Sequence, residues 1–321
     1  MLEIRNLTKI YPGPVAALQG VDLDIPAGMF GLLGPNGAGK TSLMRILAGL
    51  LEPTSGDVRL HGEDVLADPQ GLWARLGYLP QHFGFYPNLT GEAMLLHLLR
   101  LKGVRAEGRS LRQLCGELLE RVNLGYAAGR KVKGYSGGMK QRLGIAQAIA
   151  GNPELIIVDE PTAGLDPEER MRFYRILAEL AENRTVLLST HIVEDVAVLC
   201  PRFAVIRKGK VVALTTPSQA RQELEGRIFE GIASPAELDD LRRNRQVTQA
   251  HLVEGRNLVR LYEPRGDAPA GFGRVPPTLE DAYLVLMRDV GTRGDDSAEA
   301  PGDGHRRAEA ETGAERPGAT A

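Results

Sequence analysis

The sequence predicts an α/β fold with a largely parallel sheet, followed by a smaller C-terminal appendage. Three short apolar runs, MFGLLG from Met29, LIIVDE from Leu155 and TVLLST from Thr185, have the composition of buried parallel strands. Helical patterns separate these runs, and strands that alternate with helices are typical of an α/β core. The first run also leads directly into a glycine-rich segment and then a helix, which is a further signature of this class.

The N-terminal part of the chain begins with strand patterns. Residues 2–11, LEIRNLTKIY, alternate apolar and polar residues and predict an edge-type strand, and VDLDIPAG repeats the pattern before a turn. After the apolar run at 29–34, a helix is expected from about Lys40. We expect its apolar side to be formed by Leu43, Met44, Ile46, Leu47 and Leu50.

The middle of the chain is expected to carry a helical insertion. Residues from about 87 to 150 read as mostly helical, with a break rich in glycine and lysine at 129–134. After the run from Thr185, the segment AVIRKGKVVAL predicts a hairpin that turns at Lys208-Gly209. A first domain is therefore predicted at residues 1–217.

The C-terminal part is expected to be a small α+β appendage at residues 218–290, followed by a tail. The appendage is predicted to close with the helix TLEDAYLVLMRDV, which Thr278 can cap because Asp281 follows three residues later. The packed face of that helix is expected to contain Leu279, Ala282, Tyr283, Leu286 and Val290. Residues 291–321 contain no Leu, Ile, Val, Met or aromatic residue, so this tail is expected to be disordered.

Composition excludes several classes of protein. The 321 residues are 43% hydrophobic and 25% charged, which is ordinary for a globular protein and unlike a disordered chain or a coiled-coil rod. The net charge of −2 gives no general basic field, so no nucleic-acid partner is expected. Cys115 and Cys200 are too few for a disulfide scaffold and suit a reducing interior. The arginine excess, 31 of the 39 basic residues, favours a GC-rich bacterial source.

The N-terminus lacks the apolar segment of a secretory signal, and no window of about 18 apolar residues occurs. A role at a membrane would therefore require a second chain to span it.

A phosphate-binding loop stands between the first apolar run and its helix. The segment fits G-x-x-x-x-G-K-[ST], whose glycines let backbone N–H groups surround phosphates at a helix N-terminus. Lys40 is expected to reach the outer phosphates, and the Thr41 hydroxyl is expected to bind Mg²⁺. The predicted phosphate-binding residues are Gly34, Pro35, Asn36, Gly37, Ala38, Gly39, Lys40, Thr41 and Ser42.

Two acidic residues follow the second apolar run. Asp159 ends the run LIIVD, at the carboxyl end of the strand, where ligands bind in open α/β sheets. With a phosphate loop in the same chain, Asp159 is expected to bind Mg²⁺. The adjacent Glu160 is expected to activate the attacking water as a general base.

Further motifs indicate which phosphate-loop family this is. Ser136, Gly137 and Gly138 begin a helical pattern and form a second anion site at a helix N-terminus. Gln81 lies in YLPQ, His191 ends the third run, and GLDP follows the acidic pair at 164–167. Over about residues 2–220 this order of motifs resembles the ATP-binding cassette family, the ATPase subunits of ABC transporters. The resemblance implies an ABC-type nucleotide-binding domain with a mixed sheet core and a helical insertion.

The resemblance also implies roles for single residues. Tyr11 would stack on adenine, although it could instead cap a strand. Gln81 would sense Mg²⁺ and the attacking water and couple to the membrane partner. Ser136, Gly137 and Gly138 would bind the γ-phosphate held by a second copy, and Asp166 would pair across that dimer. His191 would contact the γ-phosphate, unless it is an ordinary core histidine.

Two features indicate a branch of the family. PPTLEDAYLVLM, from Pro276, and HFGFYPNLTGEAML, after Gln81, resemble ATPase subunits of ABC-2-type exporters. The aromatic residues Phe83, Phe85 and Tyr86 are expected to face a permease, or alternatively to pack under the helical insertion.

The predicted function is an ATP hydrolase that uses ATP and Mg²⁺ and drives a separate membrane permease, in export. The protein is expected to form a homodimer at the cytoplasmic face of the membrane. The alternatives are a non-transport ABC ATPase of translation or DNA repair, and an ordinary nucleotide kinase or GTPase. A single phosphate loop disfavours the first. The Ser136 loop and the lack of an N-K-x-D motif disfavour the second.

Overall fold

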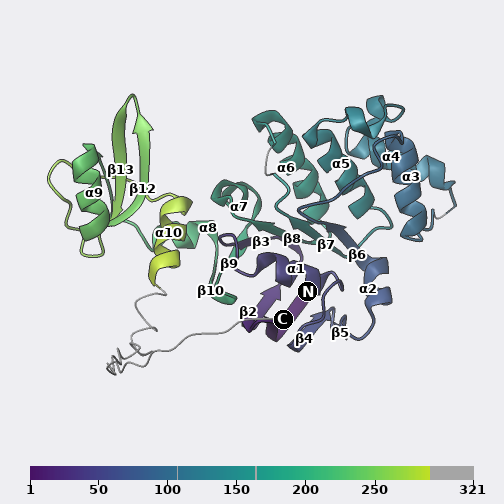
Figure 1. Ribbon diagram of the computed structural model, residues 1–321, viewed down its shortest axis with the longest axis horizontal. Helices are drawn as coiled ribbons and strands as arrows, with labels where there is room; N and C mark the ends of the chain where they lie inside the picture. The colour runs from purple at the N-terminus through teal and green to yellow at the C-terminus, as the bar shows by residue number, and fades with distance from the viewer. Residues whose placement is uncertain (107, 163–164, 290–321) are drawn as a thin grey trace, which may run out of the picture.

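The computed structural model describes residues 1–106, 108–162 and 165–289, and its fold is α/β, as the sequence predicts. Two sheets occupy the middle of the molecule, a group of helices lies at one end, and a third sheet lies at the other (Figure 1). Within these residues, no helix combines the length and the apolarity that crossing a membrane would require.

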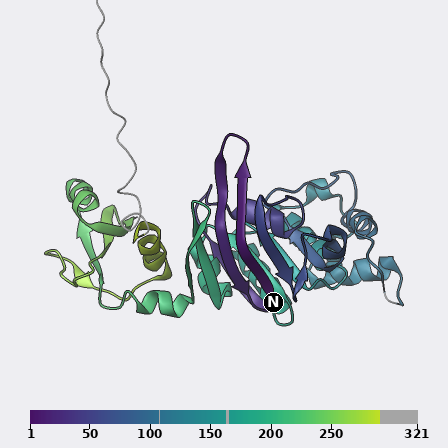
Figure 2. The same ribbon diagram turned by 90° about the horizontal axis from the view of Figure 1, so that it is seen from below.

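The first sheet is antiparallel, with the strand order β2-β1-β4-β5. Its strands are β1 (Leu2–Tyr11), β2 (Val15–Ile25), β4 (Ser55–Leu60) and β5 (Glu63–Asp64). Figure 2 shows β1 and β2 as a long hairpin. The predicted edge position of residues 2–11 is wrong, because β4 pairs with the other side of β1.

The second sheet has the order β10-β9-β3-β8-β7-β6 and is parallel except for β10. Its strands are β3 (Gly28–Leu33), β6 (Leu76–Leu79), β7 (Leu155–Asp159), β8 (Thr185–Thr190), β9 (Arg202–Arg207) and β10 (Lys210–Thr215). The three predicted apolar runs are therefore the adjacent strands β3, β8 and β7. The predicted hairpin is confirmed, with Lys208 and Gly209 both at positive φ between β9 and β10.

Helix α1 (Lys40–Leu47) packs between the two sheets and buries most of the predicted apolar side. Leu43, Met44, Ile46 and Leu47 are fully buried. Leu50 was expected on the same face but is 58% exposed, because the helix ends before it. The ending is a left-handed Gly49 with φ of 67°, after which Leu50 N donates to Arg45 O.

The helical insertion expected at about 87–150 contains α3 (Gly91–Leu101), α4 (Leu111–Arg121) and α5 (Gly137–Ala148). Between α4 and α5 are only short 3₁₀ turns, at Gly125–Ala127 and Val132–Gly134, so the predicted break is confirmed. The remaining helices that alternate with strands of the second sheet are α2 (Pro69–Arg75), α6 (Pro167–Ala181) and α7 (Val193–Leu199).

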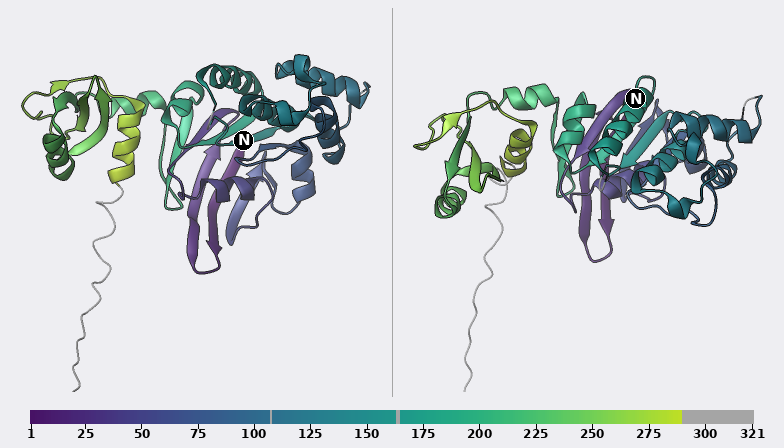
Figure 3. Two further views of the ribbon diagram at one scale, coloured as in Figure 1. Left: turned by 45° about the horizontal axis from the view of Figure 1, so that its top comes forward. Right: turned by 90° about the horizontal axis from the view of Figure 1, so that it is seen from above.

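The C-terminal region starts with α8 (Pro217–Gln222) and forms the third sheet, in the order β12-β13-β11-β14 (Figure 3). The strands are β11 (Ile228–Ala233), β12 (Gln246–Val253), β13 (Arg256–Tyr262) and β14 (Gly273–Arg274). Helix α9 (Pro235–Asn244) covers one face through Leu238. Helix α10 (Leu279–Asp289) packs on β12 and β13 from the other face.

Helix α10 also joins the C-terminal region to the rest of the molecule. It packs on α7, α8, β9 and β10, and Leu279, Ala282 and Val285 belong to the same buried cluster as the second sheet. Tyr283 and Leu286 pack against that cluster, so the predicted face is confirmed except for Val290. Val290 and the tail at 291–321 lie outside the described residues. The domain division after residue 217 stays a prediction, because the buried cluster continues across it.

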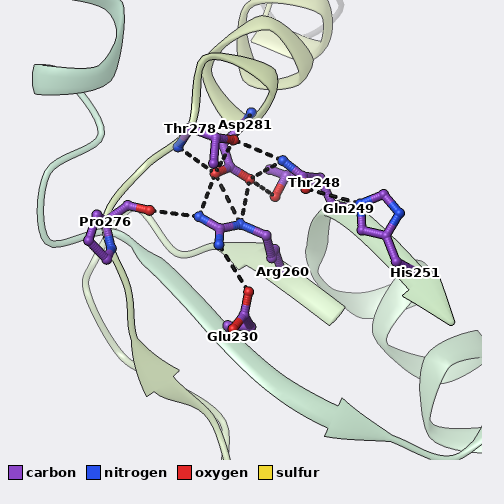
Figure 4. A network of polar contacts seen from close by, with 8 residues as sticks. All are labelled: Glu230, Thr248, Gln249, His251, Arg260, Pro276, Thr278 and Asp281. Carbon is purple, nitrogen blue, oxygen red and sulfur yellow. Dashed lines mark hydrogen bonds and ion pairs between the residues drawn. The ribbon is translucent and has the colours of Figure 1, made fainter. Parts of the chain in front are cut away.

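A buried carboxylate anchors α10 to the third sheet (Figure 4). Asp281 has no exposed surface, and its Oδ2 lies 2.8 Å from Arg260 Nη2. The Thr248 hydroxyl donates to Asp281 Oδ1 at 2.6 Å. Thr278 N donates to Oδ2 at 2.9 Å, and Thr278 Oγ1 accepts from Asp281 N at 3.1 Å, so the predicted cap is confirmed. Burial alone would raise the pKa of Asp281, but these bonds and the Arg260 charge lower it.

Candidate functional site

The loop between β3 and α1 is packed too closely for side chains at two of its glycines. A Cβ atom on Gly34 would lie 2.4 Å from Ile206 O, and one on Gly39 would lie 2.4 Å from Ala17 O. Gly39 also has φ of 105°, which other residues rarely adopt. The hairpin turn supports the loop from behind, since Gly209 N donates to Ala38 O at 2.9 Å.

Lys40, the first residue of α1, turns its side chain back into this loop. Its Nζ donates to Gly34 O at 2.6 Å and to Pro35 O at 3.3 Å. The same ammonium group lies 3.2 Å from Glu160 Oε1, and both side chains are at least 95% buried. The loop and the acidic pair, which are more than a hundred residues apart in sequence, therefore meet in one site.

Glu160 is held by its backbone and by two side chains. It follows β7 with φ of 50°, in the left-handed region, and its N–H donates to Ser189 O at 2.8 Å. Its Oε2 lies 2.5 Å from His191 Nδ1, at the end of β8. The structure thus brings together three of the predicted site residues, Lys40, Glu160 and His191, at the carboxyl edge of the parallel sheet.

Asp159 is buried beside them, with the hydroxyl groups of Ser189 and Thr41 nearby but outside hydrogen-bond geometry. It is 1% exposed, and neither carboxylate oxygen accepts a hydrogen bond from the described residues. Burial raises the pKa of Asp159 above its ordinary value, because the charged form is separated from water, although Ser189, Lys40 and Thr41 oppose this effect. Buried acceptors without donors fit a bound cation, and oxygen ligands are those that Mg²⁺ prefers. Asp159 is therefore suited to the metal that the sequence predicts.

Tyr11 lies at the end of β1, next to the start of α1. Its hydroxyl group is 3.1 Å from Ser42 Oγ, and Lys9 Nζ lies 5.4 Å from the centre of its ring. The ring is half-buried, so one part of it remains open beside the phosphate loop. This position is close to the loop without contacting Lys40 or Glu160 through any described hydrogen bond.

Gln81 lies at the same sheet edge but is exposed and shares no described hydrogen bond with Asp159 or Glu160. It follows β6, which runs parallel to β7 with Leu79 opposite Val158. The aromatic residues after it divide into two groups. Phe83 and Phe85 are half-buried against the core, as the packing alternative expects for them, whereas Tyr86 is 60% exposed.

The second anion site begins a different helix. Ser136 caps α5 by accepting a hydrogen bond from Met139 N at 3.1 Å, and both Ser136 and Gly137 are exposed. Gly138 is buried, because a Cβ there would lie 2.6 Å from Glu169 Oε2. Among the described residues, no hydrogen bond joins Ser136 to the phosphate loop, so the structure does not bring these two motifs together within one chain.

Of the GLDP motif, Asp166 lies within the described residues. Asp166 is the N-cap of α6, where its Oδ1 accepts from Glu169 N at 2.8 Å. Gly164, which belongs to the same GLDP motif, lies outside the described residues.

One buried residue that supports the site was not predicted from its sequence context. Asp195, on α7, is 0% exposed and accepts from Thr162 Oγ1 at 2.6 Å, from Thr190 Oγ1 at 3.0 Å and from Tyr174 Oη at 2.5 Å. Thr162 lies two residues after Glu160, and Thr190 immediately precedes His191. Asp195 therefore fixes both segments that carry the acidic and histidine side chains. The only signal in the sequence was an acidic residue near the start of a short helix.

Sequence comparisons agree with this geometry. A family model described as ABC transporter matches residues 18–163. The chain is 38% identical over 302 residues to the uncharacterized ABC transporter ATP-binding protein YxlF of Bacillus subtilis (strain 168), covering 89% of this chain and 99% of that protein. It is also 38% identical over 230 residues to the daunorubicin/doxorubicin resistance ATP-binding protein DrrA of Streptomyces peucetius, covering 71% and 69%.

A solved structure has the same fold over most of the chain. It is a dimeric, post-hydrolysis state of the ATP-binding cassette MJ0796 bound to ADP and Pi, with 27% identity and a TM-score of 0.60, covering 67% of this chain and 98% of that one. The chain spans only 24% of the length of a plant relative, ABC transporter A family member 7 of Arabidopsis thaliana, to which it is 39% identical. Relatives from plants and bacteria leave the bacterial source a prediction.

Proposed function

Because the chain belongs to the ABC transporter family, we propose that it is the ATP-binding and ATP-hydrolysing subunit that energises transport by a separate membrane permease. The observation that supports this proposal is that the buried Glu160 contacts both the buried Lys40 and the more exposed His191. That contact links a phosphate loop, a carboxylate and a histidine at one sheet edge, which is the arrangement needed to cut a phosphate bond.

The phosphate loop would hold the ATP phosphates. The N-terminus of α1 presents backbone N–H groups and a partial positive charge, and Lys40 adds a full charge. Lys40 needs only to exchange its carbonyl partners, Gly34 O and Pro35 O, for phosphate oxygens. Tyr11, beside Ser42, is placed to stack on the adenine ring.

Asp159, Thr41 and Gln81 are the residues that would hold Mg²⁺. When bound, the ion would neutralise charge on the phosphate oxygens. The unpartnered oxygens of Asp159 support its part in this set, and the Thr41 hydroxyl lies at the start of α1, next to Lys40. Gln81 is exposed at the same edge, so its part requires the segment after β6 to move toward the site.

Glu160 would act as the general base. It would take a proton from water while the water oxygen forms a bond to the γ-phosphorus and the bond between that phosphorus and the bridging oxygen of ADP breaks. His191 would hold Glu160 in position and contact the γ-phosphate. The network around Asp195 keeps both segments in register, since Thr190 and Thr162 donate to the same carboxylate.

A second copy of the chain would complete each site. Ser136 and Gly137 are exposed at the N-terminus of α5 and are not joined to the chain's own phosphate loop, so their N–H groups are available to the γ-phosphate of another copy. The dimeric state of the similar MJ0796 cassette supports this arrangement.

The permease would dock beside Gln81, at the cytoplasmic face of the membrane. A cavity of about 210 Å³ there is lined by Phe83, Phe85, Val132, Lys133 and Lys140, among others, and Tyr86 is exposed nearby. This cavity connects the segment after Gln81 with the helix that carries Ser136, so a docked element would touch both. Similarity to a drug-resistance ATP-binding protein supports export as the direction.

The test is ATP binding and turnover by the purified chain, together with recovery of a membrane-spanning partner from detergent-solubilised membranes. Lys40→Ala should lose ATP binding, because the loop loses its only side-chain charge. Lys210→Ala, an exposed lysine on β10, is the matched control and should bind ATP normally. Equal ATP binding by the two variants, or turnover with no membrane partner in an intact preparation, would contradict the proposal.

A further inference from the structure

A second charged cavity lies at the opposite edge of the parallel sheet from the phosphate loop. Its volume is about 280 Å³, and its walls come from the end of α4 and the segments that precede β7 and β8. Asn152 stands three residues before β7, and Arg184 immediately precedes β8. The carboxyl ends of the same two strands carry Asp159 and Thr190, so this cavity is separate from the nucleotide site.

The walls of this cavity carry an excess of positive charge. Four arginines, Arg105, Arg109, Arg121 and Arg184, line it together with one acidic residue, Glu117. Glu117 pairs with Arg109. The other three arginines, Arg105, Arg121 and Arg184, have no acidic partner among the residues that line the cavity. Within the described part of the chain, neither Arg121 nor Arg184 has a carboxylate within 4 Å.

The two unpaired arginines also affect each other. Burial lowers the pKa of Arg184, and the charge of Arg121 lowers it further. Folding therefore brings two like charges close together, which is unfavourable unless an anion lies between them. Arg121 is exposed and Arg184 is half-buried, so the cavity is open to a ligand from solvent.

A fixed turn orients Arg184. Its Nη2 donates to Asn152 Oδ1 at 2.6 Å. Asn152 has φ of 55° and follows Gly151 with φ of 82°, so two consecutive left-handed residues set the direction of the amide. The bond uses one of five guanidinium N–H groups, and the others are available to a ligand in the cavity.

We propose that this cavity binds a phosphate group. Guanidinium groups from different segments, each a planar fork of donors, suit a tetrahedral oxyanion better than a single carboxylate. The volume exceeds that of a phosphate alone, so the group belongs to a larger molecule or binds with water. A bound phosphate would join α4, in the helical insertion, to the beginnings of β7 and β8.

The first experiment measures the thermal midpoint of unfolding of the full chain with and without inorganic phosphate, at constant ionic strength. The variants are Arg121→Gln and Arg184→Gln. The matched control is Arg112→Gln, which removes the same charge from the same helix but pairs with Glu92 away from the cavity. Phosphate at the phosphate loop affects every protein equally, so differences between variants report the arginine cavity.

The wild-type chain and Arg112→Gln should gain about 2–4 °C when phosphate is present at about five times its dissociation constant. The gain should be smaller in Arg121→Gln and in Arg184→Gln, and Arg121→Lys should recover part of it. This result would assign the cavity to a soluble phosphate compound, and it does not depend on ATP turnover.

A second arm tests a lipid headgroup as the source of the phosphate. The same proteins are sedimented with phosphatidylcholine vesicles that contain or lack phosphatidic acid. Binding to the acidic vesicles that is lost in Arg121→Gln but kept in Arg112→Gln, without a difference in the phosphate shift, would support the site with a lipid ligand. Equal phosphate shifts and equal vesicle binding in all variants would overturn the proposal.

Discussion

Asp159 and Asp281 are both buried carboxylates, but their surroundings are opposite. Asp281 is surrounded by donors from Arg260, Thr248 and Thr278, and its pKa is lowered. Asp159 accepts no hydrogen bond from the described residues, and burial raises its pKa. The structure thus contains one carboxylate whose bonding is complete within the protein and one whose bonding requires something from outside.

The difference separates stability from function. A buried charge with all its partners holds elements together, and here it attaches α10 to the third sheet. A buried charge without partners costs stability unless a ligand binds to it, so such a group marks a functional site. Substitution of Asp159 should therefore affect activity more than stability, and substitution in the Asp281 network should do the reverse.

The largest expected effect is on turnover at the nucleotide edge. Glu160→Gln should lower the ATP turnover rate by about 10²–10⁴-fold, because the general base is lost. ATP binding should remain, since Lys40 keeps its loop and Asp159 is unchanged. Turnover by steady-state phosphate release and binding by titration with ATP would measure both.

A companion measurement examines the same variant for stability. Its denaturation midpoint should fall in the absence of nucleotide, because the buried Lys40 loses its counter-ion, and ATP should restore part of the loss. Near-normal turnover in Glu160→Gln would show that Glu160 is not the general base.

The next effect is on stability at the other carboxylate. Asp281→Asn should lower the free energy of unfolding of the C-terminal region by about 2–3 kcal/mol, because Arg260 loses its fully buried counter-ion and keeps only Glu230. Limited proteolysis and denaturant unfolding would measure the loss. The low pKa of Asp281 predicts that its stabilisation is present above the unfolded value of about 3.9 and is lost as the pH falls further.

The control for this prediction is Asp239→Asn, an exposed carboxylate on α9. It should change the unfolding free energy by no more than about 0.5 kcal/mol. ATP turnover per folded molecule should be the same in both variants. A stable Asp281→Asn protein would show that the network is not what holds α10.

Lys102, a half-buried cation, extends the comparison to the opposite charge. Its Nζ donates to Ala150 O at 2.9 Å and Ala148 O at 3.3 Å without an ion pair among the described residues, and burial lowers its pKa to about 8. Between about pH 8 and 10.5 the unfolded chain holds this proton and the folded chain does not. The contribution of Lys102 to stability should therefore rise with pH in this interval, by at most about 3 kcal/mol.

The measurement is denaturant unfolding at pH 7.5 and at pH 10, compared between the wild-type chain and Lys102→Met. Subtracting the two proteins removes the effect of other titrating groups. The wild-type chain should gain relative to Lys102→Met at the higher pH. A constant or opposite difference would mean that Lys102 stays charged in the folded chain.

The smallest effect is an increase in stability. Asp159→Asn should raise the unfolding free energy in the absence of nucleotide, on the order of 1 kcal/mol, because an unpartnered buried charge is removed. The same substitution should lower ATP turnover and raise the Mg²⁺ concentration needed for half-maximal turnover. Ser55→Ala, at an exposed position on β4, provides a baseline for an unrelated substitution. A destabilised Asp159→Asn would indicate that the carboxylate has protein partners after all.

Much of the core was predictable from local sequence. The runs that became β3, β7 and β8 are apolar and short, and their burial follows from composition alone. Position within a sheet was not predictable in the same way. The edge prediction for residues 2–11 was wrong because β4, more than forty residues later, pairs with β1. Strand β6 was not predicted, and it has only four residues.

The site shows the same division. The sequence indicates Lys40, Asp159 and Glu160 directly, because each lies in a motif whose residue types and spacing predict its chemical role. Asp195 could not be predicted in that way, because its role depends on hydrogen bonds from hydroxyl groups on three other segments of the chain. Asp281 was predicted as a partner of the Thr278 cap, but its bond to Arg260 depends on a strand twenty residues earlier.

The position of α10 has a consequence for synthesis of the chain. Leu279, Ala282 and Val285 belong to the same buried cluster as β7 and β8. Until α10 folds onto this cluster, the apolar residues that it covers are exposed. A ribosome releases the chain from its N-terminus, and segments fold in that order. During synthesis, part of the apolar core of the ATP-binding region therefore stays exposed to solvent until α10 has left the ribosome. Truncated or stalled chains would expose this surface and be open to proteases and aggregation.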